Sequence, residues 1–176
     1  MRIRPFDCKA AVSLQDALIQ LDQSGPDAKV LAGGTGLVLN MKKKKILPST
    51  VISLHSIKNL EYVEEKNGMI HIGAMAKHAD LAINPILEKE VSILCQAVGL
   101  IGSWQVRNIG TIGGNLCNAS PAADSAPPLL ALDASVVIAT LQGDKTIPIT
   151  SFFCGPAQTI MKSNEILKEI LIKKPV

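Results

Sequence analysis

Hydrophobic and polar positions in the first third of the chain predict a small α/β unit. Apolar residues recur at helical spacing over residues 14–21, after Ser13 as a candidate cap and before Gly25, which closes the helix. Three further elements are predicted: a strand over 29–32, a helix over 37–44 and a strand over 51–54. Because helices and strands alternate here, we expect a parallel sheet and a first lobe over residues 1–54.

The remaining pattern predicts a second lobe, over residues 55–176, built from antiparallel hairpins and helices. Its expected strands cover residues 60–64, 69–72, 135–140, 145–149 and 166–172. Asn67-Gly68 is a strong hairpin signal between the first two strands. Residues 77–100 are expected to be helical with a break at Asn84-Pro85, and the polar, glycine-rich stretch 102–128 is expected to be a loop. The predicted class is therefore α+β.

Composition excludes several classes of function. Of the 176 residues 47% are hydrophobic, the net charge is only +3 and 3% are aromatic, which does not favour nucleic-acid binding. No apolar run approaches the ~18 residues of a membrane span, and the first residues do not resemble a signal peptide, so we expect a cytoplasmic protein. The four cysteines include no CxxC pair and the three histidines lie far apart, so no metal site is expected.

The first chemical signal is the glycine-rich loop from Ala32 to Gly36, between a predicted strand and a predicted helix. Glycines permit a sharp turn, and a helix N-terminus presents N–H groups to an anion. No Gly-Lys-Ser/Thr follows, as a Walker loop requires. No Asp or Glu occurs from Ala28 to Leu60, so the ribose-binding carboxylate of a dinucleotide fingerprint is missing. Alone, this loop indicates only an anion site.

A second glycine-rich loop runs from Thr111 to Asn115 and is followed by the carboxylate of Asp124. Backbone amides suit a diphosphate, and a carboxylate suits the hydroxyls of ribose or ribitol. We therefore expect both loops to offer backbone donors to one pyrophosphate, from opposite sides. The alternative is that the glycines serve only tight turns, which is less favoured for the two loops together.

Four motifs occur in the order found in the FAD-binding subunits of molybdenum hydroxylases, the family of the carbon monoxide dehydrogenase and xanthine dehydrogenase flavoproteins. They are the segments 32–36, 72–75, 105–115 and 120–124. The chain resembles this family over nearly its whole length. The resemblance implies a two-lobed FAD-binding fold of the vanillyl-alcohol-oxidase type, with a small α/β lobe and a larger α+β lobe that contains an antiparallel sheet.

The resemblance also implies which residues contact FAD, and it implies no catalytic side chain. The glycine loops would hold the pyrophosphate, Asp124 would bind a sugar hydroxyl, and Ile101 and Leu167 match apolar contact positions. The full implied set is Leu31, Ala32, Gly33, Gly34, Thr35, Gly36, Leu37, Ile101, Thr111, Ile112, Gly113, Gly114, Asn115, Asp124 and Leu167.

Members of this family act with a ferredoxin-like 2Fe-2S subunit and a large molybdopterin-binding subunit. The resemblance implies that electrons pass from the iron–sulfur clusters to FAD and then to NAD or another acceptor. The usual C-terminal flavoprotein domain is expected to be absent. Two alternatives stay open: a scaffold subunit that has lost flavin, or a stand-alone flavin oxidase. Against the second, residues 32–40 contain no His or Cys for covalent flavin attachment.

Overall fold

The computed structural model describes residues 3–174, and its N-terminal part is a three-stranded parallel sheet in the order β1-β3-β2. The strands are β1 (Asp7–Ala10), β2 (Lys29–Leu31) and β3 (Thr50–Ser53), and β3 pairs in parallel with both neighbours. The parallel sheet predicted from the pattern is thus confirmed. The edge strand β1 was not predicted, because all four of its residues are exposed and carry no apolar period.

Two helices accompany this sheet, α1 (Leu14–Ser24) and α2 (Thr35–Lys42). The start of α1 is held by a reciprocal cap, in which Ser13 Oγ accepts the Asp16 N–H (3.1 Å) and Asp16 Oδ2 accepts the Val12 N–H (2.9 Å). Its apolar face then packs toward β3. The helix α2 begins directly at the first glycine loop, two residues earlier than the pattern predicted.

The second part of the chain contains a five-stranded antiparallel sheet in the order β4-β5-β10-β6-β7. Its strands are β4 (Val63–Lys66), β5 (Met69–Gly73), β6 (Ser135–Thr140), β7 (Gly143–Pro148) and the central β10 (Ile166–Lys173). Asn67 and Gly68 both have positive φ, 54° and 73°, as a two-residue type I′ turn requires. The prediction placed the first strand too early, because residues 58–60 form the 3-10 helix η1 (Lys58–Leu60).

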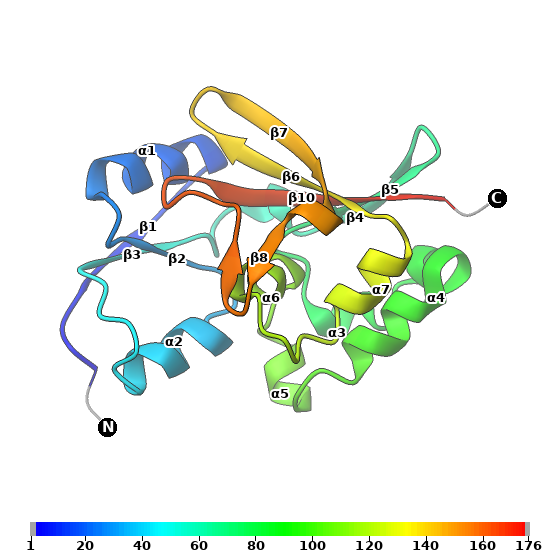
Figure 1. The fold of residues 1–176 in the computed structure, drawn as a ribbon, viewed down its shortest axis with the longest axis horizontal. Helices are drawn as coiled ribbons and strands as arrows, with labels where there is room; N and C mark the ends of the chain where they lie inside the picture. The colour runs from blue at the N-terminus through cyan, green and yellow to red at the C-terminus, as the bar shows by residue number, and fades with distance from the viewer. Residues whose placement is uncertain (1–2, 175–176) are drawn as a thin grey trace.

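Helices cover one face of this sheet (Figure 1). The predicted break at Asn84-Pro85 is confirmed, since α3 (His78–Leu81) ends before it and Asn84 caps α4 (Pro85–Gly99). The stretch expected as a loop contains three short helices, α5 (Trp104–Arg107), α6 (Ile112–Asn118) and α7 (Ala126–Ala131). The 3-10 helix η2 (Ile149–Ser151) and a small hairpin, β8 (Phe153–Gly155) with β9 (Gln158–Thr159), complete the described elements.

Two hydrophobic clusters hold these layers together. The larger lies between the five-stranded sheet and its helices, and includes Ile70, Leu94, Phe152 and Ile170, each 0% exposed. The smaller joins the first sheet and α1 to residues of the later part of the chain. The two sheets lie on either side of residue 54 in the sequence, and the lobe boundary there stays a prediction.

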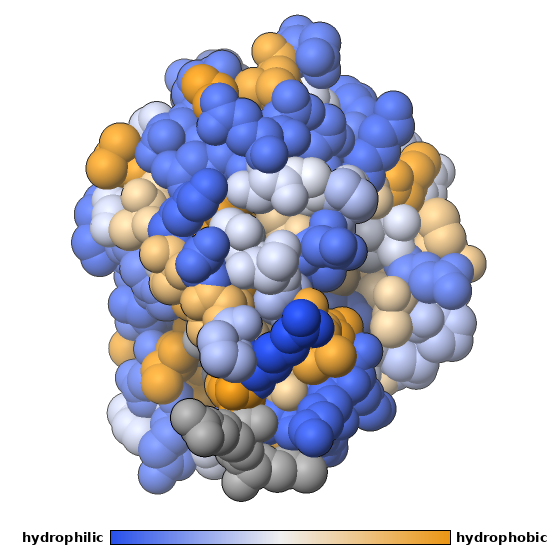
Figure 2. All heavy atoms as spheres, turned by 90° about the vertical axis from the view of Figure 1, so that its left-hand side faces the viewer, coloured by the Kyte–Doolittle hydropathy of each residue, from blue (hydrophilic) through white to orange (hydrophobic). Residues whose placement is uncertain are grey.

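The surface gives two further observations. The face turned to the viewer in Figure 2, formed mainly by the parallel sheet and its helices, is largely hydrophilic, with hydrophobic side chains in small separate groups. Between residues 3 and 174, none of the helices combines the length and the apolar character that a membrane crossing requires.

Candidate functional site

The two glycine loops, which are about 75 residues apart in the chain, lie against each other at the first turns of α2 and α6. A Cβ added to Gly33 would lie 2.2 Å from the carbonyl oxygen of Ile109, so the two backbones are in direct contact. A Cβ added to Gly114 would lie 3.5 Å from the Cβ of Ala32. Only glycine permits the closer of these two approaches. The structure therefore brings together the two motifs that the sequence singled out.

The first loop presents a row of free backbone donors. Gly34 adopts the left-handed conformation (φ 78°) and turns the chain from β2 into α2, where the Val38 N–H makes the first helical bond to the Gly34 carbonyl. Within residues 3–174, no acceptor is found for the backbone N–H groups of residues 33–37. Unpaired N–H groups at the positive end of a helix dipole form a binding site for an anion.

The second loop differs, because its backbone donors already have partners inside the protein. The Ile112 N–H donates to the Ala76 carbonyl (3.0 Å), the Gly113 N–H to the Ala74 carbonyl (2.9 Å) and the Gly114 N–H to Thr111 Oγ1 (3.2 Å). The expectation that both loops offer rows of free amides is thus wrong for α6. A Cβ on Gly113 would lie 2.6 Å from the Cβ of Ala74, so this glycine permits close packing within the protein.

The segment that follows α6 is tied back to it by a buried hydrogen bond. Ser125, 0% exposed, donates its hydroxyl to Asn115 Oδ1 at 2.6 Å. Ala119 turns the chain with a positive φ of 44°, and the Ala157 N–H donates to its carbonyl at 2.8 Å. Asp124 is exposed in this segment, and its carboxylate has no hydrogen-bond partner within the described chain. Its oxygens are therefore accessible to the hydroxyls of a ligand.

The two apolar positions expected to contact the cofactor lie in the hydrophobic core. Ile101 is 8% exposed and Leu167 is 4% exposed, and both belong to the larger cluster. Core packing accounts for their apolar character. Arg107 supports the turn that begins at Ile101, because its Nη1 donates to the carbonyl oxygens of Ile101 (3.1 Å) and Gly102 (3.2 Å).

Sequence reasoning missed three residues of this region. His78, 2% exposed, donates its backbone N–H to the Gly110 carbonyl (3.0 Å), and burial lowers the pKa of its ring to about 4. Asn118 lies beside Gly36 across the junction of the two loops. Ser125 orients the Asn115 amide, as described above. The spacing of these residues along the chain does not predict their contacts. His78 and Asn118 contact segments that are distant in the sequence, and Ser125 reaches Asn115 only because the chain turns between them.

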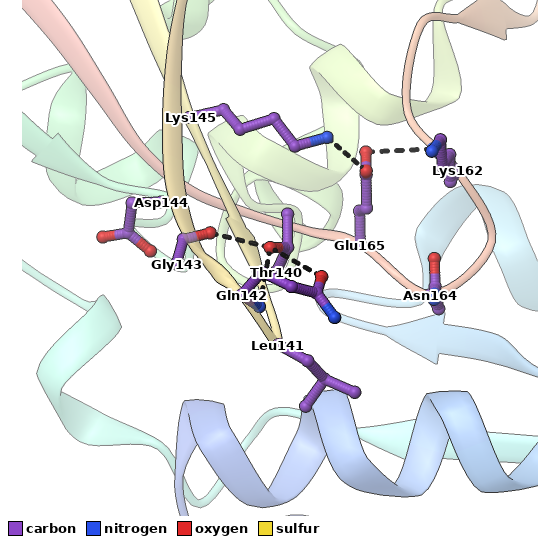
Figure 3. Close-up of a pocket in the computed structure, with 9 residues that line it drawn as sticks. All are labelled: Thr140, Leu141, Gln142, Gly143, Asp144, Lys145, Lys162, Asn164 and Glu165. Carbon is purple, nitrogen blue, oxygen red and sulfur yellow. Dashed lines mark hydrogen bonds and ion pairs between the residues drawn. The ribbon is translucent and has the colours of Figure 1, made fainter.

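The hollow drawn in Figure 3 is separate from the two loops. Its volume is about 330 Å³. It lies at the turn between β6 and β7, beside the loop that precedes β10. Glu165 accepts a hydrogen bond from Lys145 Nζ (2.5 Å) and another from the Lys162 N–H (3.1 Å). Although burial alone would raise the pKa of Glu165, these bonds lower it below its ordinary value. The carboxylate is thus already paired within the protein.

Among the residues from 3 to 174, no group of three or more His, Cys, Asp or Glu side chains is placed to hold a metal ion. Cys95 is buried, whereas Cys8, Cys117 and Cys154 are exposed.

Comparison with known proteins relates this geometry to a family. The family described as "FAD binding domain in molybdopterin dehydrogenase" matches residues 4–175. The carbon monoxide dehydrogenase medium chain of Hydrogenophaga pseudoflava is 35% identical over 167 residues, which cover 95% of this chain and 58% of that protein. The nicotinate dehydrogenase FAD-subunit of Eubacterium barkeri is 33% identical, over 98% of this chain and 60% of that protein.

Solved structures agree with these sequence matches. A carbon monoxide dehydrogenase structure from Hydrogenophaga pseudoflava superimposes with a TM-score of 0.97 at 34% identity, over 100% of this chain and 61% of that chain. Quinoline 2-oxidoreductase from Pseudomonas putida 86 gives a TM-score of 0.96 at 29% identity. The chain thus spans about 60% of the length of these relatives. It has the expected α+β FAD-binding fold and belongs to the family of FAD-binding domains of molybdopterin dehydrogenases.

Proposed function

We propose that this chain holds FAD at the junction of its two glycine loops and acts as the flavin-binding part of a molybdenum hydroxylase. The observation that carries this proposal is the row of unpaired N–H groups over residues 33–37 at the start of α2, packed against the second loop. Such a row of donors matches the charge and the hydrogen-bond acceptors of a diphosphate. Its donor chemistry thus fits the cofactor that the family binds.

Different residues of the site would bind different parts of FAD. The N–H groups of residues 33–37 would hold the diphosphate, and the exposed carboxylate of Asp124 would accept hydrogen bonds from a sugar hydroxyl. Residues 111–115 form the wall that keeps α2 in place, because Gly114 packs on Ala32. The remaining proposed contacts are the apolar side chains of Leu31, Leu37, Ile101 and Leu167.

The chemistry in this proposal comes from the cofactor, since FAD can accept electrons singly and release them as a pair. The chain binds the diphosphate, orients the cofactor and limits the access of water through its packed loops. No acid, base or nucleophile among its side chains is required. We therefore assign no catalytic residue to residues 3–174.

The electron path extends this proposal to other chains. Relatives are named as the medium chain of carbon monoxide dehydrogenase and as the beta subunit of caffeine dehydrogenase, so those proteins work as parts of larger assemblies. We propose that a 2Fe-2S subunit delivers electrons to the cofactor on this chain and that a molybdopterin subunit oxidises the substrate. NAD or another acceptor would then take the electrons.

The proposal is tested at Thr35, the exposed first residue of α2. Thr35→Asp places a carboxylate at the N-terminus of α2. There the negative charge interacts favourably with the helix dipole but repels a bound diphosphate. We expect FAD affinity to fall by about tenfold or more, while the apoprotein melts at the same or a higher temperature. Thr35→Asn, a neutral polar control, should stay within about threefold of the unmodified chain.

Fluorescence titration with FAD and thermal melts of the apoprotein give the two readouts. If Thr35→Asp binds FAD as tightly as Thr35→Asn, the diphosphate is not held at α2. If the unmodified chain binds no FAD at all, the flavin-free scaffold becomes the better account.

A further inference from the structure

We infer that Asn118 is a specificity-determining residue of the diphosphate cradle, an inference that rests on the proposed FAD site. Asn118 is the last residue of α6, and its side chain reaches across to the first turn of α2. A Cβ added to Gly36 would lie 3.3 Å from Asn118 Oδ1 and 4.0 Å from Nδ2. The carboxamide thus lies beside Gly36, one of the five residues whose N–H groups are free.

This carboxamide is free to bind a ligand. Asn118 is an exposed residue, and its side chain has no hydrogen-bond partner within the described chain. Its oxygen and its NH₂ group exchange places by a rotation of 180°, so the NH₂ can face the cradle and offer two donors. Asn118 would then add a side-chain donor to the row of backbone donors on α2.

A side chain at position 36 would overlap the place that the Asn118 carboxamide occupies. A contact of 3.3 Å between an added Cβ and Oδ1 is tighter than ordinary packing, so a side chain at position 36 would displace the carboxamide. A glycine at the second position of α2 therefore leaves room for a polar group that comes from α6. The missing side chain at Gly36 on α2 and the polar side chain of Asn118 on α6 thus depend on each other.

The charge of this group decides which ligand the cradle prefers. No Asp or Glu occurs from Ala28 to Leu60, so the first loop brings no negative charge to the cradle. An aspartate at position 118 has almost the same shape as asparagine but adds a negative charge next to the bound anion. The neutral amide thus selects for a diphosphate, where a carboxylate would oppose it.

A charge series at position 118 tests this inference. With FAD and with ADP as probes, we expect Asn118→Asp to weaken binding by about tenfold and Asn118→Lys to strengthen it, both effects shrinking as salt rises. Asn59→Asp, the same change at an exposed position of η1, is the matched control and should stay within about twofold. Melting curves of each apoprotein check the fold.

A double variant tests the shared space. Gly36→Ser should weaken FAD binding in the unmodified background and recover most of it when combined with Asn118→Ala, because the serine then has room and supplies the polar group. Additive losses in the double variant, or Asp and Lys variants that bind like the unmodified chain, would overturn the role of Asn118 alone. Failure of the unmodified chain to bind FAD or ADP would overturn the proposed function together with it.

Discussion

At the scale of single residues, His78 shows how a titratable group is built into the support of the site. Its ring packs under the second loop, where a Cβ added to Gly110 would lie 3.1 Å from its Cδ2. Nδ1 is buried and has no hydrogen-bond partner within the described chain. Charging such a ring is costly in an apolar environment, and burial therefore lowers its pKa from 6.5 to about 4.

This pKa predicts an acid-sensitive contribution to stability. The unfolded chain binds a proton at His78 below pH 6.5 and the folded chain only below about pH 4, so the free energy of unfolding decreases as the pH falls through this window. The loss reaches about 3 kcal/mol at its largest. Denaturant unfolding of the apoprotein at several pH values should show it, and the His78→Gln and His78→Phe variants should lack it. An unchanged pH slope in both variants would contradict the assignment.

At the scale of elements, α6 is a helix that its own residues do not favour. It is seven residues long and contains Gly113 and Gly114, each of which costs about 1 kcal/mol relative to alanine in a helix. It forms because Thr111 caps its start and because the turn that follows β5, at residues 74–76, accepts two of its N–H groups. Contacts with distant segments thus replace intrinsic propensity.

The cap of α6 provides a prediction at this scale. Thr111→Ala removes the acceptor of the Gly114 N–H and should lower the free energy of unfolding by about 1 kcal/mol, whereas Thr111→Ser retains the hydroxyl and most of the stability. Urea unfolding of the two apoproteins provides the comparison. Equal stability of the Ala and Ser variants would show that the cap contributes nothing.

Some helices and strands were predicted well from local sequence patterns, and others were not. The hairpins β4-β5 and β6-β7 and the break before α4 were predicted, and the signals at Asn67-Gly68 and Asn84-Pro85 favour turns and caps in any context. The small hairpin β8-β9 was not predicted. The short helices between residues 102 and 131 were missed, since glycine and proline obscure their period. The exposed edge strand β1 was missed for the same lack of an apolar pattern.

At the scale of the whole molecule, the smaller hydrophobic cluster joins the two sheets. Leu18 and Leu21 of α1 belong to the same buried cluster as Ala139 and Ile166, which come from strands of the antiparallel sheet. Neither part can bury its apolar face fully without the other. We therefore expect the described residues to unfold as one cooperative unit.

This coupling is tested by Leu18→Ala. Leu18 is 2% exposed, and its truncation should lower the free energy of unfolding by about 2–5 kcal/mol. Protection from amide hydrogen exchange should fall by the same free energy in β10 as in α1. Ile19→Ala, at a neighbouring position that is 40% exposed, should have a much smaller effect. Loss of protection confined to the first 54 residues would show that the two parts unfold separately.

The fold class and the two hairpins of the five-stranded sheet follow from the sequence, because turn residues, caps and apolar periods act over a few neighbouring positions. The order of the glycine motifs along the chain is likewise enough to indicate the family. Long-range packing, in contrast, leaves the N–H groups of residues 33–37 free and pairs those of Ile112 and Gly113. The same packing places Asn118 beside Gly36 and buries His78 under Gly110. Each of these outcomes depends on which remote backbone supplies an acceptor or occupies a space, and no local pattern records that choice.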